Sequence, residues 1–381
     1  MIYFDNNATT PTAPEVFEAM RPFLTNEFGN PSSAHSAGNR AKLAVENARE
    51  QLAGLLGAAS ASEIVFSSCG TESDNWGILG GLQAGPDKNH IVTTRVEHEA
   101  VRKIAEQIEA SGFEVTWLDV DEEGLLDLSA VADAIRPTTA VVSVMLANNE
   151  TGVLFPVDRI AEIVKERSDA LMHVDGVNAV GKVPIDLKSS LIDLFSVSAH
   201  KFYGPKGVGA LYIRGGVELP SFLTGGGQES GRRAGTEAVH QIVGIGAAAA
   251  YVSDLGPMEK VRELRDRLES ELLQLPSARL NGTADDQKRL PNTSNISFEN
   301  TNGEAILARL DELGICVSTG SACNAKDHKA SAVLTAMNIP YSYAMGSIRF
   351  SLGRHNTRDE VDTVVSEVSN IVADLRKLAG H

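Results

Sequence analysis

The segment Leu194-Phe195-Ser196-Val197-Ser198-Ala199-His200-Lys201 decides the fold of this chain. Its first four residues are mostly apolar and predict a buried strand, which runs directly into polar residues and Lys201. The run from Gly204 to Gly207, with the sequence Gly-Pro-Lys-Gly, then predicts a turn. A lysine between the end of a strand and a glycine turn is well placed to present its amine to a carbonyl compound.

A second predicted strand, Leu171 to Asp175, ends in a carboxylate. A buried and unpaired carboxylate costs several kcal/mol, so Asp175 is expected to have a cationic partner. A protonated pyridine nitrogen would be such a partner, and the ion pair would keep the ring poor in electrons. Taken alone, Asp175 would be read as a capping residue at the end of a strand.

A phosphate-binding turn is predicted after the strand Ile64 to Ser67, where Gly70-Thr71-Glu72-Ser73 opens a helix. Free backbone amides at the start of a helix, with a hydroxyl beside them, bind phosphate well. Thr71 is the candidate anchor, although a role as N-cap would explain the same residue. His200 and Ser198 stand one and three positions before Lys201 and would complete the cradle. An amine, an electron sink and a phosphate cradle together predict pyridoxal 5'-phosphate (PLP) bound to Lys201.

Two further residues are candidates for catalysis. His98 follows the predicted strand Ile91 to Thr94, at the edge where open α/β sheets place their ligands, and would lie over the cofactor ring. Cys323 ends the small-residue run Ser318-Thr319-Gly320-Ser321-Ala322-Cys323, which predicts a loop with an exposed thiol. Such a thiol is a nucleophile once it is ionised, but a lone cysteine of this kind is also read as an incidental surface residue.

These residues, with several longer motifs, resemble the cysteine desulfurases of the NifS and IscS type, in the class V aminotransferase family. The likeness extends from the first residues to the C-terminal helix, and the motifs are Tyr3 to Thr10, Gly29 to Ser33, Asn148 to Gly152, and Gly231 to Thr236. The resemblance implies the PLP-dependent transferase fold type I, with a mainly parallel seven-stranded sheet, helices on both faces and a smaller α/β domain. It also implies a large domain over 13–254 and a small domain over 1–12 and 255–381, which carries the Cys323 loop.

The resemblance implies roles for the cofactor-binding residues. Lys201 would form the Schiff base with PLP and move the Cα proton, and His98 would stack on the ring as an acid and base. Asp175 would pair with the pyridine nitrogen. The family usually has a glutamine for the ring hydroxyl where this chain has Asn178. The implied cofactor-binding set is Gly70, Thr71, His98, Asn149, Asp175, Asn178, Ser198, His200, Lys201 and Thr236.

The resemblance also implies the substrate, the product and the partners. Arg349, with help from Asn149, would bind the substrate carboxylate through a guanidinium fork. L-cysteine would give alanine and a persulfide on Cys323, which would pass to a sulfur-acceptor protein such as an iron–sulfur scaffold. Thr236 matches a threonine that reaches the cofactor phosphate of the other subunit, which implies a homodimer.

Two classes of alternative stay open. Lys201 and Asp175 fit other PLP enzymes of this fold equally well, among them selenocysteine lyases, β-eliminating C–S lyases and aminotransferases. Cys323 discriminates between them, because an eliminating enzyme would release free sulfide and pyruvate instead of forming a persulfide. A non-catalytic scaffold for sulfur-accepting proteins would need no cofactor.

Composition agrees with a two-domain enzyme. The chain has 381 residues, 43% of them hydrophobic, which is enough for two cores. Lys and Arg total 34 against 50 Asp and Glu, so the net charge is -16, and without a basic run nucleic acid is excluded as a partner. The most apolar helix candidate, 242–252, is too short to cross a membrane, so a cytoplasmic protein is expected.

The cysteines and the remaining histidines indicate no metal site and no disulfide framework. Three cysteines without a C-x-x-C pair fit neither. Cys316, in an apolar strand, is expected in the core, and Cys69 is expected to fill space beside the phosphate turn. The histidines predicted to be structural are His35, His240 and His355.

Strand and helix patterns alternate with short polar or glycine breaks, which predicts an α/β domain with a mainly parallel sheet. One helix is clear from apolar residues on a single face between Ala41 and Leu55, and Gly57 closes it. Further strands are predicted at 115–118, 141–145 and 208–213. The smaller domain is predicted to contain helices over 258–275 and 358–378 and a strand over 295–298.

Overall fold

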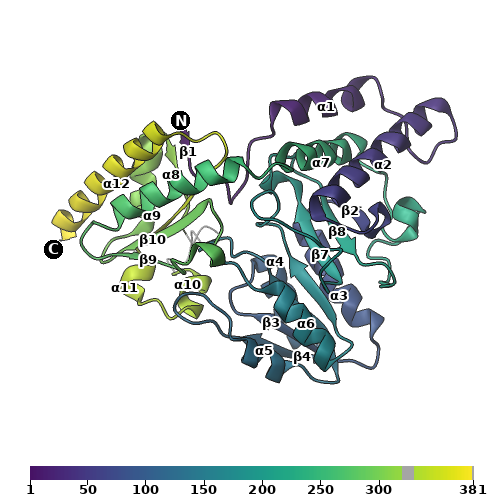
Figure 1. Cartoon of the computed structure of the whole chain (residues 1–381), viewed down its shortest axis with the longest axis horizontal. Helices are drawn as coiled ribbons and strands as arrows, with labels where there is room; N and C mark the ends of the chain where they lie inside the picture. The colour runs from purple at the N-terminus through teal and green to yellow at the C-terminus, as the bar shows by residue number, and fades with distance from the viewer. Residues whose placement is uncertain (320–329, 380–381) are drawn as a thin grey trace.

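The computed structural model describes residues 1–319 and 330–379. Its central element is a seven-stranded sheet in which β8 runs antiparallel to both of its neighbours and the remaining pairs are parallel (Figure 1). In spatial order the strands are β2 (Ile64–Ser67), β8 (Gly209–Ile213), β7 (Leu194–Ser198), β6 (Leu171–Asp175), β5 (Thr139–Met145), β3 (His90–Thr94) and β4 (Glu114–Leu118). The predicted mainly parallel sheet is therefore confirmed.

Helices cover both faces of the sheet, because successive apolar residues of each strand belong to different clusters. Ile64 and Phe66 of β2 pack in the largest cluster, with the helices α1 (Pro14–Thr25), α2 (Ser36–Leu56), α5 (Leu128–Ala134), α6 (Val157–Arg167) and α7 (Val239–Val252). Val65, between them, faces the other side, which is covered by α3 (Gly70–Ala84) and α4 (Glu99–Ala110). Burial on both faces explains why these strands lack a polar side.

The helix predicted to end at Gly57 is confirmed as α2. Gly57 adopts a left-handed conformation, with φ of 60°, and its N–H bonds the last carbonyls of the helix. The helix begins at Ser36, five residues before the first apolar residue used to predict it, because Nδ1 of His35 accepts a hydrogen bond from the Gly38 N–H. His35 is thus a structural residue, as predicted, although histidine is an unusual cap.

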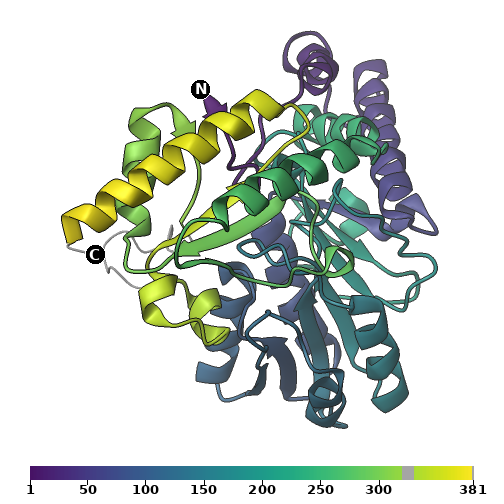
Figure 2. The ribbon, with the colours of Figure 1, turned by 60° about the vertical axis from the view of Figure 1, so that its left-hand side comes forward.

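The C-terminal part forms a second body around its own apolar cluster. A three-stranded antiparallel sheet is built from β9 (Ala278–Leu280), β10 (Thr293–Phe298) and β12 (Ser347–Ser351), and helices α8 (Pro257–Leu272) and α12 (Arg358–Ala379) pack side by side on it (Figure 2). The remaining elements are α9 (Gly303–Glu312), β11 (Ile315–Cys316), α10 (Ala332–Ala336) and α11 (Tyr341–Ala344).

The first residues of the chain pack with this C-terminal body. Strand β1 (Ile2–Tyr3) pairs in parallel with β11, and Phe4 is fully buried in the C-terminal cluster. This arrangement agrees with the predicted small domain, which combines residues 1–12 with residues 255–381. The exact bounds of that domain remain a prediction. One expectation is wrong: Cys316 lies in a strand as predicted, but that strand is short and at an edge, so its thiol is half-buried and not in the core.

Within the ranges 1–319 and 330–379, no helix combines the length and the apolar character needed to cross a membrane.

Candidate active site

A cavity of about 180 Å³ opens at the C-terminal ends of the parallel strands. The register pairs Asp175 of β6 with Met145 of β5 and with Ser196 of β7, so the residues that follow these strands meet at one edge. The cavity brings together nine of the predicted site residues, which are Gly70, Thr71, His98, Asn149, Asp175, Asn178, Ser198, His200 and Lys201.

Lys201 ends a short 3-10 helix directly after β7. Its Nζ donates hydrogen bonds to the backbone oxygens of Asn7 at 2.5 Å and Ala8 at 3.1 Å. Burial, and then the positive charge of Arg349, lower the pKa of the Lys201 amine to about 8. A useful fraction of this amine is therefore unprotonated near neutral pH, as a nucleophile toward a carbonyl carbon requires.

Asp175 is a buried carboxylate at the end of β6. Its Oδ1 accepts the Val177 N–H at 2.9 Å, and no cationic side chain in the described part of the chain forms an ion pair with it. Burial raises the pKa of Asp175, while the charges of His98 and Lys201 oppose this shift. Because an uncompensated buried carboxylate is costly, the cavity fits a ligand with a cationic nitrogen at this point.

The N-terminus of α3 forms another wall of the cavity. Its N-cap, Cys69, makes no side-chain cap, so the first amides of the helix lack that partner. A Cβ on Gly70 would lie 2.7 Å from Cγ2 of Val177, and so only glycine keeps this approach open. Neither the Thr71 nor the Ser198 hydroxyl bonds a residue within 1–319 or 330–379. This wall fits an anion such as a phosphate.

The two histidines of the cavity are held in different ways. Nδ1 of His98 accepts the Ala100 N–H at 3.2 Å, and burial lowers the pKa of His98, so the neutral ring carries its proton on Nε2. Nδ1 of His200 lies 3.2 Å from Oγ1 of Thr9, and burial lowers the pKa of His200 to about 4. Both rings are thus neutral near pH 7, and Nε2 of His98 can donate one hydrogen bond in the cavity.

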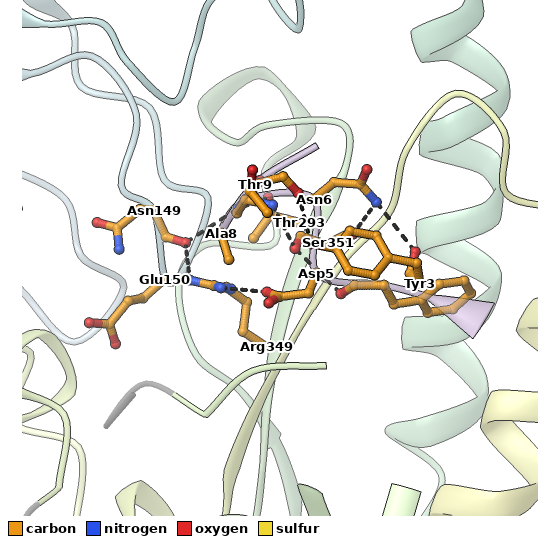
Figure 3. A network of polar contacts seen from close by, with 12 residues as sticks. Tyr3, Asp5, Asn6, Ala8, Thr9, Asn149, Glu150, Thr293, Arg349 and Ser351 are labelled. Atoms are coloured by element: carbon orange, nitrogen blue, oxygen red, sulfur yellow. Dashed lines mark hydrogen bonds and ion pairs between the residues drawn. The ribbon is translucent and has the colours of Figure 1, made fainter. Parts of the chain in front are cut away.

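Arg349 and Thr236 do not line the cavity. Arg349, on β12, lies beside it: one guanidinium nitrogen bonds Oδ1 of Asp5 at 2.7 Å and another bonds the backbone oxygen of Asn149 at 3.1 Å (Figure 3). Thr236 is exposed on the loop before α7, so a role at a cofactor would need a second subunit. Cys323 lies outside the described residues.

The sequence reasoning missed the part played by the N-terminal segment. Backbone oxygens of Asn7 and Ala8 hold the Lys201 amine. Asp5 pairs with Arg349 (Figure 3). The run Asn6-Asn7-Ala8-Thr9-Thr10 was a signal, because polar residues directly after a short strand often serve a site. It could not show which residues they meet more than 190 positions away.

Two buried carboxyl groups near Asp175 were missed as well. Asp74 lines the cavity from α3, and burial together with the nearby Asp175 raises its pKa well above the usual value. Burial also raises the pKa of Glu97 to about 8, although its Oε1 accepts from Thr94 at 2.8 Å and from the Met145 N–H at 3.1 Å. These two groups stay protonated more readily than an exposed acid, which leaves Asp175 as the carboxylate best able to carry charge.

Comparison with known proteins supports this geometry. The family model described as "Aminotransferase class-V" matches residues 2–364. The chain is 50% identical to "Cysteine desulfurase" of Trichormus azollae, and the match covers 100% of this chain and 94% of that one. It is 48% identical to "Cysteine desulfurase NifS" of Azotobacter vinelandii, with the same coverage.

Solved structures agree. A "NIFS-LIKE PROTEIN" superposes with a TM-score of 0.92 at 40% identity, covering 98% of this chain and 100% of that one. "SspA in complex with cysteine" superposes with a TM-score of 0.82 at 35% identity, covering 94% and 100%. The expected PLP-dependent transferase fold type I is thereby confirmed. The full-length matches place this chain in the class V aminotransferase family, among the cysteine desulfurases of the NifS type.

Proposed function

We propose that this chain uses PLP to remove sulfur from L-cysteine, giving alanine and a persulfide on Cys323. The observation that carries the proposal is the cavity itself. It places the Lys201 amine, with a pKa of about 8, together with the unpaired carboxylate of Asp175 and the open N-terminus of α3. A reactive amine, a site for a cationic ring nitrogen and a site for a phosphate are the three features that PLP requires.

When bound, PLP supplies an electron sink for the bonds at the substrate Cα. Lys201 would hold the cofactor covalently through its aldehyde, and Asp175 would pair with the ring nitrogen. The amides of Gly70 and Thr71 would hold the phosphate, together with side chains that offer hydrogen bonds: Thr71, Ser198, His200 and, from the partner of a homodimer, Thr236. Asn178 would contact the ring hydroxyl.

The substrate would be held and deprotonated by residues around this cavity. Arg349 would bind the substrate carboxylate, since its guanidinium already holds the carboxylate of Asp5 and the backbone oxygen of Asn149 beside the cavity. Once the substrate amine has taken its place on the cofactor, the freed Lys201 amine would take the Cα proton, because its lowered pKa suits a base near neutral pH. His98 would supply a proton through Nε2, the nitrogen that carries it in the neutral ring.

Sulfur transfer would follow from attack by the Cys323 thiolate on the substrate sulfur. An S–S bond forms, the C–S bond breaks, and the electron pair of that bond stays with the product carbon. This carbon then takes a proton and leaves as part of alanine. The persulfide sulfur would pass to an acceptor protein, such as an iron–sulfur scaffold.

The experiment that tests this proposal uses the purified chain with PLP and L-cysteine. We expect alanine to form, and peptide mass spectrometry to find one extra sulfur atom on the peptide that contains Cys323. Pyruvate and free sulfide would show an eliminating lyase instead. A protein that takes up no PLP and makes no alanine would favour a non-catalytic scaffold.

Substitution of Asp175 by asparagine is expected to stabilise the apoprotein while it weakens PLP binding. Because burial raises the pKa of Asp175 above the usual 3.8, the folded state binds the proton of this carboxyl group more tightly than the unfolded state does. The stability gained from this proton is fully present below pH 3.8 and is lost as the pH rises through the folded pKa. At pH 7 the variant should therefore unfold with a free energy higher by about 1 kcal/mol. The gain should vanish near pH 3, as urea unfolding at both pH values would show.

The same variant should bind PLP about 100-fold more weakly, because a buried ion pair loses one charge. Fluorescence titration of the apoprotein measures this change. The matched control is Asp169→Asn, since the Asp169 carboxylate is exposed and pairs with Lys88 away from the cavity. Equal PLP affinity in the wild type and the Asp175→Asn variant would show that the Asp175 carboxylate does not pair with the cofactor.

A further inference from the structure

Lys182 is a second buried lysine that the proposed chemistry does not use. Its exposed fraction is 8%, and it forms no ion pair with any Asp or Glu in residues 1–319 or 330–379. Its Nζ donates hydrogen bonds to Asn178, at 2.8 Å to the backbone oxygen and at 3.2 Å to Oδ1 of the side chain. Burial, followed by the charges of Lys201 and Arg349, lowers the pKa of Lys182 to about 7.

The partner of this lysine lines the cavity. Asn178 is 6% exposed, and its side chain has one acceptor end and one donor end. Because Nζ of Lys182 is a donor, its bond identifies the oxygen end of the amide. Nδ2 of Asn178 forms no hydrogen bond with any residue that the structure describes. The donor end is therefore the end that remains for a ligand in the cavity.

The backbone fixes both residues on one turn directly after Asp175. The N–H groups of Ala179 and Val180 bond the Gly176 oxygen, and the Lys182 N–H bonds the Ala179 oxygen at 3.0 Å. A Cβ at Gly176 would lie 1.9 Å from the Phe195 ring, so this turn packs tightly on β7. Lys182 then reaches back over one turn to the amide. The local backbone and the burial of both side chains therefore hold this contact in place, unlike a contact made by an exposed side chain.

We propose that Lys182 is a positioning residue, which holds the Asn178 amide so that its N–H donors serve the ring hydroxyl of PLP. The inference rests on the proposed function. The contact of Lys182 with Oδ1 leaves the N–H end of the Asn178 amide for a ligand in the cavity. Leaving a buried amine without an ionic partner is costly, so a specific gain at the cavity would explain it.

The test compares PLP with its 3-deoxy analogue, which lacks the ring hydroxyl, as ligands of the apoprotein. The full chain is titrated with each compound by fluorescence, and the ratio of the two dissociation constants is the readout. The wild type should prefer PLP by about fivefold, the effect of one net hydrogen bond. Asn178→Ala and Lys182→Met should each bring the ratio close to one, and the double variant should give the same ratio as either single variant.

A matched control is Lys165→Met, because Lys165 also donates to a backbone oxygen and to a side chain, those of Ala170 and Asp193, but lies away from the cavity. It should keep the wild-type ratio. If Lys182→Met does not fold, Lys182→Gln serves in the same comparison. A ratio unchanged by either substitution at Lys182 would overturn the inference. A wild type that binds neither compound would instead overturn the proposed function.

Discussion

Replacing Lys201 with alanine should lower the rate of alanine formation from L-cysteine by about 10⁴-fold. Two losses combine in this variant, since the covalent hold on the cofactor and the base for the Cα proton depend on the same Nζ. Among the cavity-lining residues that the structure describes, Lys201 is the only lysine, and the backbone oxygens of Asn7 and Ala8 hold its amine. The initial rate of alanine formation, measured at saturating PLP, checks the prediction.

A second readout separates the loss of covalent attachment from slow turnover. Borohydride reduction should fix PLP to the peptide containing Lys201 in the wild type and leave no fixed cofactor in the variant. Lys206→Ala is the matched control, because Lys206 is exposed on the neighbouring turn. A Lys201→Ala protein that still retains reduced PLP on another lysine, at full activity, would show that the amine was misassigned.

Replacing Cys323 with alanine should abolish the protein persulfide and reduce alanine formation to the background rate. The side chain of alanine has no thiolate to attack the substrate sulfur, and the C–S bond then lacks an acceptor for its sulfur atom. Binding of PLP should be unchanged, because the cofactor would be held by groups that line the cavity after β5, β6 and β7 and at the start of α3. The measurements are alanine by amino-acid analysis and persulfide by peptide mass.

Cys316→Ala is the matched control for this variant, since Cys316 is a half-buried free thiol on β11. It should keep both the rate and the modified peptide. Cys69 is unsuitable as a control because it lines the cavity. Sulfur transfer to an acceptor at the wild-type rate by the Cys323→Ala protein would show that the nucleophile is another group.

Most strands of the large sheet could be predicted because they are buried on both faces and so are rich in apolar residues, whereas β4 is only partly buried. Leu171–Asp175 has the predicted C-terminal end, and Leu194–Ser198 ends one residue after the predicted Val197. The polar last residues of both strands mark the edge of the cavity. The helix start at Ser36 could not be predicted from apolar periodicity, because its first turn has no large apolar residue and a histidine caps it. Cys316 was misplaced because an apolar sequence does not reveal that a strand has only two residues.

The candidate site likewise contains residues that the sequence could reveal and contacts that it could not. Residues at strand ends, such as Asp175 and Lys201, are close in space because parallel strands end at one edge, and a sequence can reveal this. The pairing of Asp5 with Arg349 depends on how the N-terminal segment crosses the molecule, which no local pattern encodes. The contact between Lys182 and Asn178 joins residues four positions apart, but the sequence does not reveal that both side chains are buried, and this burial is what points to a role at the cavity.

The pairing of β1 with β11 has a consequence for synthesis in the cell. The backbone oxygens that hold Lys201 belong to Asn7 and Ala8, yet the segments on which this part of the chain docks, Ile315–Cys316 and Ser347–Ser351, are made more than 300 residues later. Until those segments are made, β1 lacks its partner strand and Phe4 lacks its apolar surroundings. A truncated nascent chain that stops before residue 347 therefore lacks both Arg349 and the strand on which Asp5 docks, even when the whole large sheet has already formed.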